Sequence, residues 1–352
     1  MSEIQKIPAL NGIRALSVVM VVASHTGRVP LIPGGFGVTV FFFLSGYLIT
    51  TLLLNEYKKN KVINMRFFFV RRLLRLSPAF LVSISLTYFL SSLNLIAGNA
   101  TLVGMLAQVF YFANYFDIFF DGAQYTASGT GVYWSLAVEE HFYFLYPFIL
   151  VFLLNRLSVK GIVYSFFTLI FLVLAWRFFL YSNVILNENR ILFATDTRID
   201  SILFGCLLGV VKNPINFLNN RGLRLRDYCL LFSALFIIFI SFIFRDEWFR
   251  LVPRFTIQGF GLMVLFYYAI AFSQHKMFSF LNWKILNIIG VYSYSIYLSH
   301  VVIIKLIKIN SPILYESFML LPTVFICSFI YAFIIFKLVE KPMYYFRKKF
   351  IA

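Results

Sequence analysis

Long runs of hydrophobic residues, separated by short polar segments, fill most of the chain. Runs of about the length that crosses a membrane, near 20 residues, recur along it. They lie near residues 11–28, 36–55, 76–97, 134–154, 161–181, 198–212, 226–244, 255–272, 285–308 and 317–337. The pattern predicts an all-α polytopic integral membrane protein with about ten transmembrane helices, in one domain over residues 1–352. A further apolar stretch, 102–121, is either an eleventh span or a segment that does not cross the membrane.

Composition agrees with the membrane interpretation. Hydrophobic residues make up 61% of the chain and charged residues 13%, whereas soluble domains average about 45–50% and about 25%. An ordinary soluble enzyme is therefore excluded. The net charge of +17 would suit nucleic acid, but Lys and Arg cluster in short connections between apolar runs. We therefore expect a lipid bilayer as the surroundings and no nucleic-acid partner.

The basic residues also predict sidedness. Basic loops stay in the cytoplasm, which assigns residues 56–75, 155–160, 212–226 and 273–284, and both termini, to that side. If 102–121 crossed the membrane, most later basic loops would face outward. We therefore expect this stretch to be a re-entrant or interfacial segment.

Two ionisable residues lie on the first predicted span. Arg14 and His25 are eleven residues apart, about 16 Å along a helix axis, and share nearly the same face. A guanidinium at the membrane edge suits a phosphate-bearing ligand, and an imidazole inside the membrane suits proton transfer near neutral pH. The alternative is that Arg14 only anchors the helix and His25 is a hydrogen-bonded core residue. Their shared face favours a functional pair.

A basic cluster precedes the third predicted span. Arg71, Arg72 and Arg75 lead into Pro78, and Arg71 and Arg75 share a helical face. Guanidinium groups match phosphate oxygens in a two-pronged geometry, so the cluster is a candidate clamp for a pyrophosphate or a nucleotide phosphate. The alternative is that a juxtamembrane basic helix binds lipid headgroups.

Polar residues also lie in the second and fourth predicted spans. The Gly-rich segment 34–47 contains Ser45, and tight helix packing explains such a segment more often than a ligand does. Ser135 and Glu139 lie one turn apart at the outer start of the fourth span, and Glu140 follows. Carboxylates at a membrane interface are costly and usually functional, and one of them could orient His25.

Three later segments carry further polar residues. Asp196 and Asp200 bracket Arg198 at the outer end of the sixth span, which indicates an ion-pair network with either a structural or a substrate-binding role. Tyr297 and His300 lie on a polar stripe of the ninth span, where His300 is either catalytic or a hydrogen-bonded core residue. The tripeptide at 340–342, Glu-Lys-Pro, is expected to end the last span with a local ion pair. The three cysteines show no paired spacing, so no metal site is indicated.

In this order, the segments resemble the membrane-bound acyltransferase 3 family, which includes bacterial O-acetyltransferases of surface glycans. The matching pieces are Arg14-x10-His25, Gly35-x-Gly37-Val with Ser45-Gly46-Tyr47, Arg72-x-x-Arg75 before Pro78, Trp134-Ser135-Leu-x-x-Glu139-Glu140-x-Phe-Tyr143, Asp196-x-Arg198-x-Asp200, Ser293-Tyr294-Ser295-Ile-Tyr297-Leu-x-His300 and Glu340-Lys341-Pro342. His141 stands where Gln is expected, and Ser299 where Trp is common. Many relatives carry a C-terminal periplasmic esterase-like domain, and this chain resembles the stand-alone form.

The resemblance implies an enzyme of the bacterial inner (cytoplasmic) membrane. It would transfer an acetyl group from acetyl-CoA to a hydroxyl of a surface or lipid-linked glycan, such as lipopolysaccharide O-antigen or exopolysaccharide. His25 would be the general base, or would itself carry the acetyl group. The other implied roles are Glu139 or Glu140 to orient His25, Ser45 and Ser135 as oxyanion donors, and Arg14, Arg71, Arg72 and Arg75 as ligands of the CoA phosphates.

Two alternatives remain open. The same chemistry could use a succinyl donor, or peptidoglycan, a lipid or a small molecule as acceptor. A transporter or flippase of a lipid-linked sugar could use the same arginines as substrate ligands, without acetyl-CoA. Transporters often show internal repeats, and none is visible in this sequence.

Overall fold

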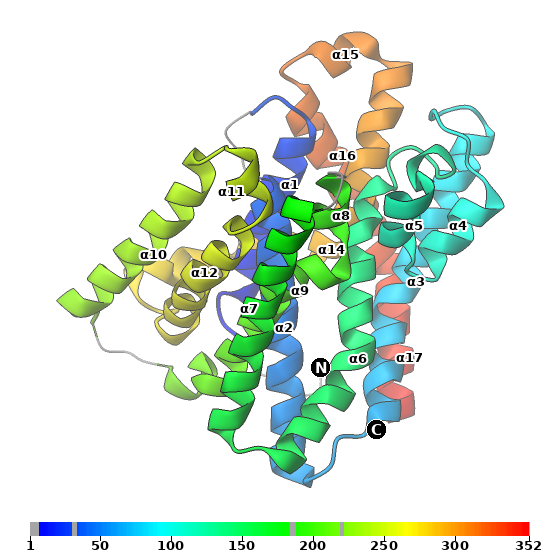
Figure 1. Cartoon of the computed structure of the whole chain (residues 1–352). Helices are drawn as coiled ribbons and strands as arrows, with labels where there is room; N and C mark the ends of the chain where they lie inside the picture. The colour runs from blue at the N-terminus through cyan, green and yellow to red at the C-terminus, as the bar shows by residue number, and fades with distance from the viewer. Residues whose placement is uncertain (1–6, 30–33, 184–187, 219–221, 352) are drawn as a thin grey trace. The chain divides into compact units, whose positions relative to one another are not determined.

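The computed structural model describes residues 7–29, 34–183, 188–218 and 222–351, and these residues form helices and loops without a strand. Ten helices overlap the ten predicted spans (Figure 1). They are α1 (Leu10–His25), α2 (Gly34–Asn60), α3 (Met65–Ser92), α6 (Trp134–Arg156), α7 (Val159–Asn183), α9 (Thr195–Val211), α10 (Leu225–Ile243), α12 (Arg254–Ala271), α14 (Lys284–Asn310) and α16 (Leu320–Ile335).

Eight of the described helices are long and apolar enough to cross a membrane. Helices α1 and α9 are shorter, with 16 and 17 residues. The helices confirm the predicted fold class, a polytopic all-α membrane protein. Which ends face the cytoplasm stays a prediction.

The ambiguous stretch 102–121 is not one helix. It folds into α4 (Leu102–Val109) and α5 (Ala113–Phe120), each of eight residues. Such a helix is about 12 Å long, whereas the hydrocarbon core is about 30 Å thick. Thr101 caps α4 by accepting a hydrogen bond from the backbone of Gly104, and Tyr111 separates the two helices at φ 57°. Neither helix can span the membrane by itself.

Shorter elements lie in the connections and, for α17, at the C-terminal end of the described residues. They are α8 (Glu188–Phe193), α11 (Glu247–Leu251), α13 (Lys276–Ser279), α15 (Pro312–Glu316), α17 (Lys341–Ile351), the 3-10 turns Gly122–Gln124, Gly131–Tyr133, Pro214–Phe217 and Phe280–Asn282, and the π-helical turn Phe336–Glu340.

The last helix does not end where Pro342 predicts. The π-helical turn after α16 leads directly into α17, which contains Pro342 as its second residue. A proline removes one backbone hydrogen bond from a helix, and the π-helical turn directly before Pro342 is where the hydrogen-bond pattern already departs from that of an α-helix. The expectation that residues 340–342 terminate the span was therefore wrong.

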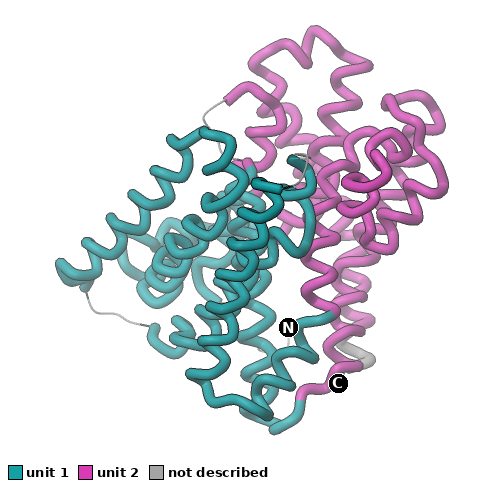
Figure 2. Tube along the Cα trace, in the orientation of Figure 1, with its two compact units in different colours: residues 1–17, 35–62, 145–290 teal, residues 18–34, 63–144, 291–352 magenta. Residues whose placement is uncertain are grey.

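The chain forms two compact units (Figure 2). Unit 1 comprises residues 1–17, 35–62 and 145–290, and unit 2 comprises 18–34, 63–144 and 291–352. Each unit is assembled from three stretches that are distant in the sequence, so long-range helix contacts hold it together.

In unit 1, two glycines bring α2 and α9 into close contact. A Cβ atom on Gly46 would overlap the carbonyl oxygen of Ile202, and one on Gly205 would overlap that of Phe43. Small residues let the backbones of neighbouring membrane helices approach closely. Gly46, whose role the sequence left open, therefore serves helix packing.

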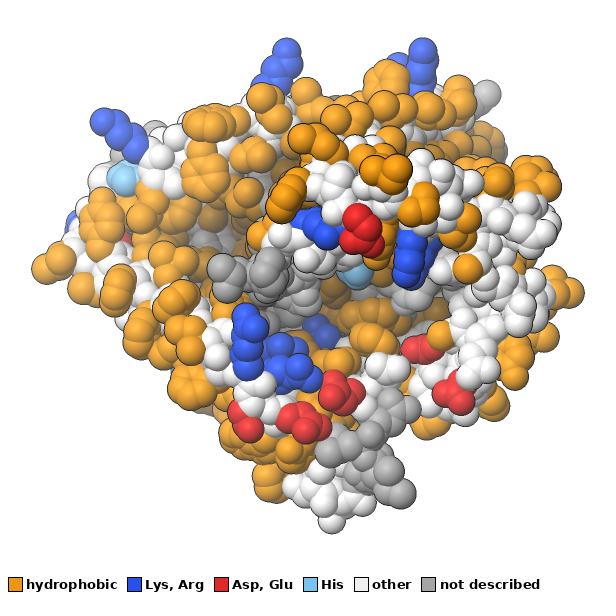
Figure 3. All heavy atoms as spheres, turned by 90° about the horizontal axis from the view of Figure 1, so that it is seen from above, with side chains coloured by type: hydrophobic (Ala, Val, Ile, Leu, Met, Phe, Trp, Pro, Cys, Tyr) orange, Lys and Arg blue, Asp and Glu red, His pale blue; other side chains and the backbone are white. Residues whose placement is uncertain are grey.

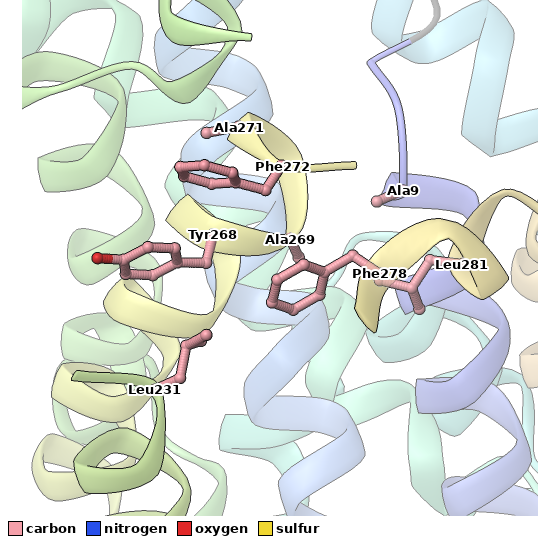
Figure 4. Close-up of a cluster of buried hydrophobic side chains, with 8 residues drawn as sticks. All are labelled: Ala9, Leu231, Tyr268, Ala269, Ala271, Phe272, Phe278 and Leu281. Atoms are coloured by element: carbon pink, nitrogen blue, oxygen red, sulfur yellow. The ribbon is translucent and has the colours of Figure 1, made fainter. Parts of the chain in front are cut away.

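A buried apolar cluster lies elsewhere in unit 1 (Figure 4). Its members are Ala9, Leu231, Tyr268, Ala269, Ala271, Phe272, Phe278 and Leu281. The hydroxyl of Tyr268 donates to Asp227 of α10 at 2.8 Å, so its polar end is satisfied by a residue outside this cluster.

Hydrophobic side chains also cover much of the surface in view in Figure 3. On α10, Phe232 is 71% exposed and Phe239 is 58% exposed. Such large apolar side chains are costly to leave in water. Their exposure fits a surface that faces lipid.

Candidate active site

A pair of histidines stands at the centre of the candidate site in unit 2. His25 is the last residue of α1, and its Nδ1 lies 2.9 Å from the carbonyl oxygen of Val21 and 3.3 Å from Nε2 of His300 on α14. The two rings meet edge to face, with centroids 5.0 Å apart. His300 is fully buried, whereas His25 is exposed.

The hydrogen bonds fix which nitrogens carry protons. A carbonyl oxygen only accepts, so Nδ1 of His25 must donate to Val21. Nδ1 of His300 lies 2.7 Å from the carbonyl oxygen of Tyr297, so it donates as well. In a neutral ring the Nε2 of His300 then carries a lone pair, which faces Nδ1–H of His25.

This arrangement leaves Nε2 of His25 as a proton acceptor. That atom makes no hydrogen bond to any residue the structure describes. His300 therefore holds the tautomer in which His25 can act as a base. The sequence predicts Glu139 or Glu140 in this orienting role. The structure shows His300 at Nδ1, and the role of the two glutamates stays a prediction.

Tyr297 connects this histidine pair to Ser135 on α6. The Ser135 and Tyr297 hydroxyls lie 2.7 Å apart, and both contact the carbonyl oxygen of Val132. Both residues are buried. One residue therefore fixes His300 through its carbonyl and Ser135 through its hydroxyl.

The two glutamates are linked to the basic cluster on α3. The Tyr143 hydroxyl donates to Glu139 at 2.8 Å, and the guanidinium of Arg72 lies 3.3 Å from the centre of the Tyr143 ring. Glu140 is close enough to Arg72 and Glu139 for both charges to act on it. This network holds α3 against α6.

The other two arginines of the cluster have different neighbours. Arg75 is close to Glu340, which lies in the π-helical turn and accepts a hydrogen bond from Ser295 at 2.6 Å. Arg71 is close to Arg347 of α17. Residue Glu340, which the sequence assigned only to a helix end, is thus part of the polar interior of unit 2.

Arg14 and Ser45 belong to unit 1, as do the residues of the segment 196–200. Arg14 lies on α1, the helix that also carries His25. Ser45 is buried on α2. The structure thus brings together His25, His300, Tyr297 and Ser135, and separately Glu139, Glu140 and Arg72.

The expected ion-pair network around Arg198 involves residues that the sequence did not single out. Asp200 pairs with Arg177 of α7 at 2.7 Å, with both side chains fully buried. Asp196 pairs with Arg190 at 2.6 Å and accepts from Trp176. An arginine inside an apolar run is a costly exception, and that signal could have identified Arg177.

The environment of Asp196 lowers its pKa. Burial acts in the opposite direction, but the hydrogen bonds from Arg190 and Trp176 and the charge of Arg190 outweigh it. Arg198, which is almost fully buried, stacks over the Phe255 ring at 3.8 Å and donates to the Leu192 carbonyl oxygen at 2.9 Å.

Comparisons with known proteins identify the class. A family model described as an acyltransferase domain matches residues 7–338. Together with the eight helices that are long and apolar enough to cross a membrane, this match places the chain in a family of membrane acyltransferases. The chain belongs to the acyltransferase 3 family, as its motifs indicated.

Its curated relatives are longer proteins. The chain is 33% identical over 322 residues to the O-acetyltransferase OatA of Staphylococcus aureus strain NCTC 8325, an alignment that covers 86% of this chain and 51% of OatA. It is also 33% identical over 323 residues to a putative O-acetyltransferase of Staphylococcus aureus strain COL, covering 87% of this chain and 52% of that protein. The chain therefore spans about half the length of these relatives. No solved structure matches it.

Proposed function

We propose that the protein is an O-acetyltransferase that moves an acetyl group from cytoplasmic acetyl-CoA to a hydroxyl of an extracytoplasmic glycan. The proposal rests on Nε2 of His25, which has no hydrogen bond to any described residue and is held as a proton acceptor by Val21 and His300. The names of its O-acetyltransferase relatives support the acetyl group and the hydroxyl acceptor. A multi-pass protein of this family is expected in the bacterial cytoplasmic membrane.

In this mechanism His25 is the general base. Its Nε2 accepts the proton of the acceptor hydroxyl while the hydroxyl oxygen forms a bond to the acetyl carbonyl carbon. The bond from that carbon to the CoA sulfur breaks, and the proton passes from His25 to the departing thiolate. In the alternative route, Nε2 itself attacks the thioester carbon and the bond from that carbon to the CoA sulfur breaks. The acceptor hydroxyl then attacks the acetyl carbon, the bond to Nε2 breaks, and the hydroxyl proton ends on the CoA thiolate.

We assign donor binding to the guanidinium groups of Arg71, Arg72 and Arg75 in unit 2. Arg71, Arg72 and Arg75 lie within two turns of α3, and guanidinium forks match phosphate oxygens. Ser135, which lies in the same unit as His25, is the proposed oxyanion donor. The Ser135 hydroxyl bonds with Tyr297 in the structure, so it must turn from this partner to serve the oxyanion.

The first prediction concerns His25→Ala in purified, reconstituted protein. General bases contribute about 10²–10⁴-fold to rate, so transfer of radiolabelled acetyl from acetyl-CoA to glycan should fall by at least that factor. His275→Ala, which changes a histidine that caps α13, is the matched control and should keep its activity.

Binding of the donor is measured in the same preparations. Acetyl-CoA should raise the apparent melting temperature of wild type and His25→Ala alike, because a ligand that binds only the folded state stabilises it. The shift should be lost in Arg72→Ala. Full transfer by His25→Ala would contradict both mechanistic routes. A wild type whose melting temperature does not change with acetyl-CoA would contradict acetyl-CoA as the donor.

A further inference from the structure

Tyr297 contacts the candidate site through two different groups. Its backbone carbonyl oxygen lies 2.7 Å from Nδ1 of His300, and its hydroxyl lies 2.7 Å from the hydroxyl of Ser135. Tyr297, Ser135 and His300 are all buried, with exposed fractions of 7%, 4% and 0%. The proposed mechanism uses His25 and Ser135, and it assigns no part to the Tyr297 hydroxyl.

Two hydroxyls and one carbonyl oxygen form a triangle at this place. The Tyr297 hydroxyl lies 3.0 Å and the Ser135 hydroxyl 3.1 Å from the carbonyl oxygen of Val132. The carbonyl oxygen only accepts, and each hydroxyl has a single proton to donate. Either Tyr297 donates to Ser135 and Ser135 to Val132, or Ser135 donates to Tyr297 and Tyr297 to Val132.

Only the first arrangement prepares Ser135 to donate to an oxyanion. Its Oγ then accepts from Tyr297, and rotation about the Cβ–Oγ bond turns its proton from Val132 to a new acceptor. In the second arrangement the protons of both hydroxyls would have to move. A phenol is also a stronger hydrogen-bond donor than an aliphatic alcohol, which favours donation by Tyr297. Such a chain of hydrogen bonds polarises the Ser135 O–H bond and strengthens its bond to the oxyanion.

We propose that Tyr297 is a positioning residue whose hydroxyl donates to Ser135 while Ser135 donates to the oxyanion. The inference rests on the proposed function, in which the acetyl carbonyl oxygen gains negative charge as the acceptor oxygen bonds to its carbon. Both hydroxyls keep their protons throughout, and Ser135 exchanges the Val132 carbonyl for the oxyanion. Tyr297 thus holds the partner of the base through its carbonyl and the oxyanion donor through its hydroxyl.

The test is a double-mutant cycle of Tyr297→Phe and Ser135→Ala in reconstituted protein. Phenylalanine keeps the ring and the backbone carbonyl, so the contact with His300 is retained. Tyr297→Phe should lower kcat about 10–100-fold without changing the KM for acetyl-CoA, and Ser135→Ala should lower kcat about 10²–10³-fold. In the Ser135→Ala protein, Tyr297→Phe should lower kcat no further, because the group that it orients is gone.

Tyr133→Phe is the matched control. Tyr133 is also buried, and its hydroxyl donates at 3.2 Å to the carbonyl oxygen of Leu298, the residue after Tyr297. Residues 132–133 and α14 therefore exchange one tyrosine–carbonyl hydrogen bond in each direction. Both phenylalanine variants should lower the apparent melting temperature by a similar amount, and only Tyr297→Phe should lower kcat.

Three results would overturn the proposal: equal kcat values of Tyr297→Phe and Tyr133→Phe, full activity of Ser135→Ala, or independent effects of the two substitutions in the double variant.

Hydrolysis of acetyl-CoA, with water in place of the acceptor, is measured beside transfer to glycan. A wild type that hydrolyses acetyl-CoA with this coupling but acetylates no glycan would contradict the proposed function and leave the role of Tyr297 standing. A wild type that neither hydrolyses acetyl-CoA nor transfers its acetyl group would overturn both.

Discussion

At the scale of single residues, the proton arrangement of two imidazoles determines what His25 can do. His300 is buried and donates its own Nδ1–H to Tyr297, so it presents only a lone pair to His25. A neutral histidine in this position orients the base without adding a negative charge beside the reacting carbonyl. We regard His300 as a positioning residue.

The second prediction therefore concerns His300. Replacing it by alanine should lower kcat by about 10–100-fold, the usual effect of losing an orienting partner, with little change in the KM for acetyl-CoA. His300→Gln should recover part of the loss, because its amide oxygen can accept from His25 and its amide nitrogen can donate to Tyr297. A merely structural residue would instead lower stability in both variants without this split between kcat and KM.

The sequence identified both histidines but could not pair them. They are 275 positions apart, and only the folded helices bring Nδ1 of one to Nε2 of the other. The motif predicts Glu139 or Glu140 as the acid that orients His25. In the structure, Glu139 accepts a hydrogen bond from Tyr143. Residue chemistry was predictable, and partner choice was not, because it depends on packing between distant segments.

At the scale of helices, the third prediction tests the contact between α2 and α9. Gly205→Ala would drive a methyl group into the backbone of Phe43, and overpacking of this kind costs about 1–3 kcal/mol. The apparent melting temperature in detergent should fall accordingly. Gly35→Ala is the control, because a Cβ there meets nothing within 4 Å. Equal stability of the two variants would contradict the close helix contact.

The fourth prediction concerns how low pH affects the stability that Asp196 contributes. This residue joins α7, α8 and α9 through Trp176 and Arg190. Its pKa in the folded protein is lowered, whereas the pKa of an aspartate in an unfolded chain is about 3.9. Its contribution to stability is therefore present above that value and is lost as the pH falls through the folded pKa.

Melting curves between pH 7 and pH 3 check this. Asp196→Asn should be less stable than wild type at pH 7, and the difference should shrink below about pH 4. Glu247→Gln, which changes a carboxylate on α11, serves as the control. A difference between wild type and Asp196→Asn that is constant over this range would rule out the ionised carboxylate as the cause.

Element positions were largely predictable, and their ends were not. All ten apolar runs became helices because a chain in lipid must satisfy its backbone internally. The π-helical turn before Pro342 left no signal in the sequence, because it depends on the packing of residues 336–340. Arg177 was overlooked because a single charge barely changes the hydropathy of a 25-residue helix.

At the scale of the whole molecule, the distribution of Lys and Arg predicts which loops face the cytoplasm. The fifth prediction uses a variant in which Cys206, Cys229 and Cys327 are alanine. A cysteine at Gln124 should react with a membrane-impermeant maleimide in intact cells, and one at Lys59 only after permeabilisation. Both positions are exposed, so access does not limit the reaction. The reverse labelling pattern would show that the predicted topology is inverted, and that acetyl-CoA enters from the opposite side.

The position of His25 at the last residue of α1 has an electrostatic consequence. The carbonyl groups at the end of a helix carry a partial negative charge of about half an electron, worth about 0.3–1 kcal/mol to a nearby cation. Gly27, at φ 67°, turns the chain away just beyond it, so the imidazole stays at the open end of the helix dipole. When His25 accepts a proton, the dipole of α1 can therefore serve as its counter-charge.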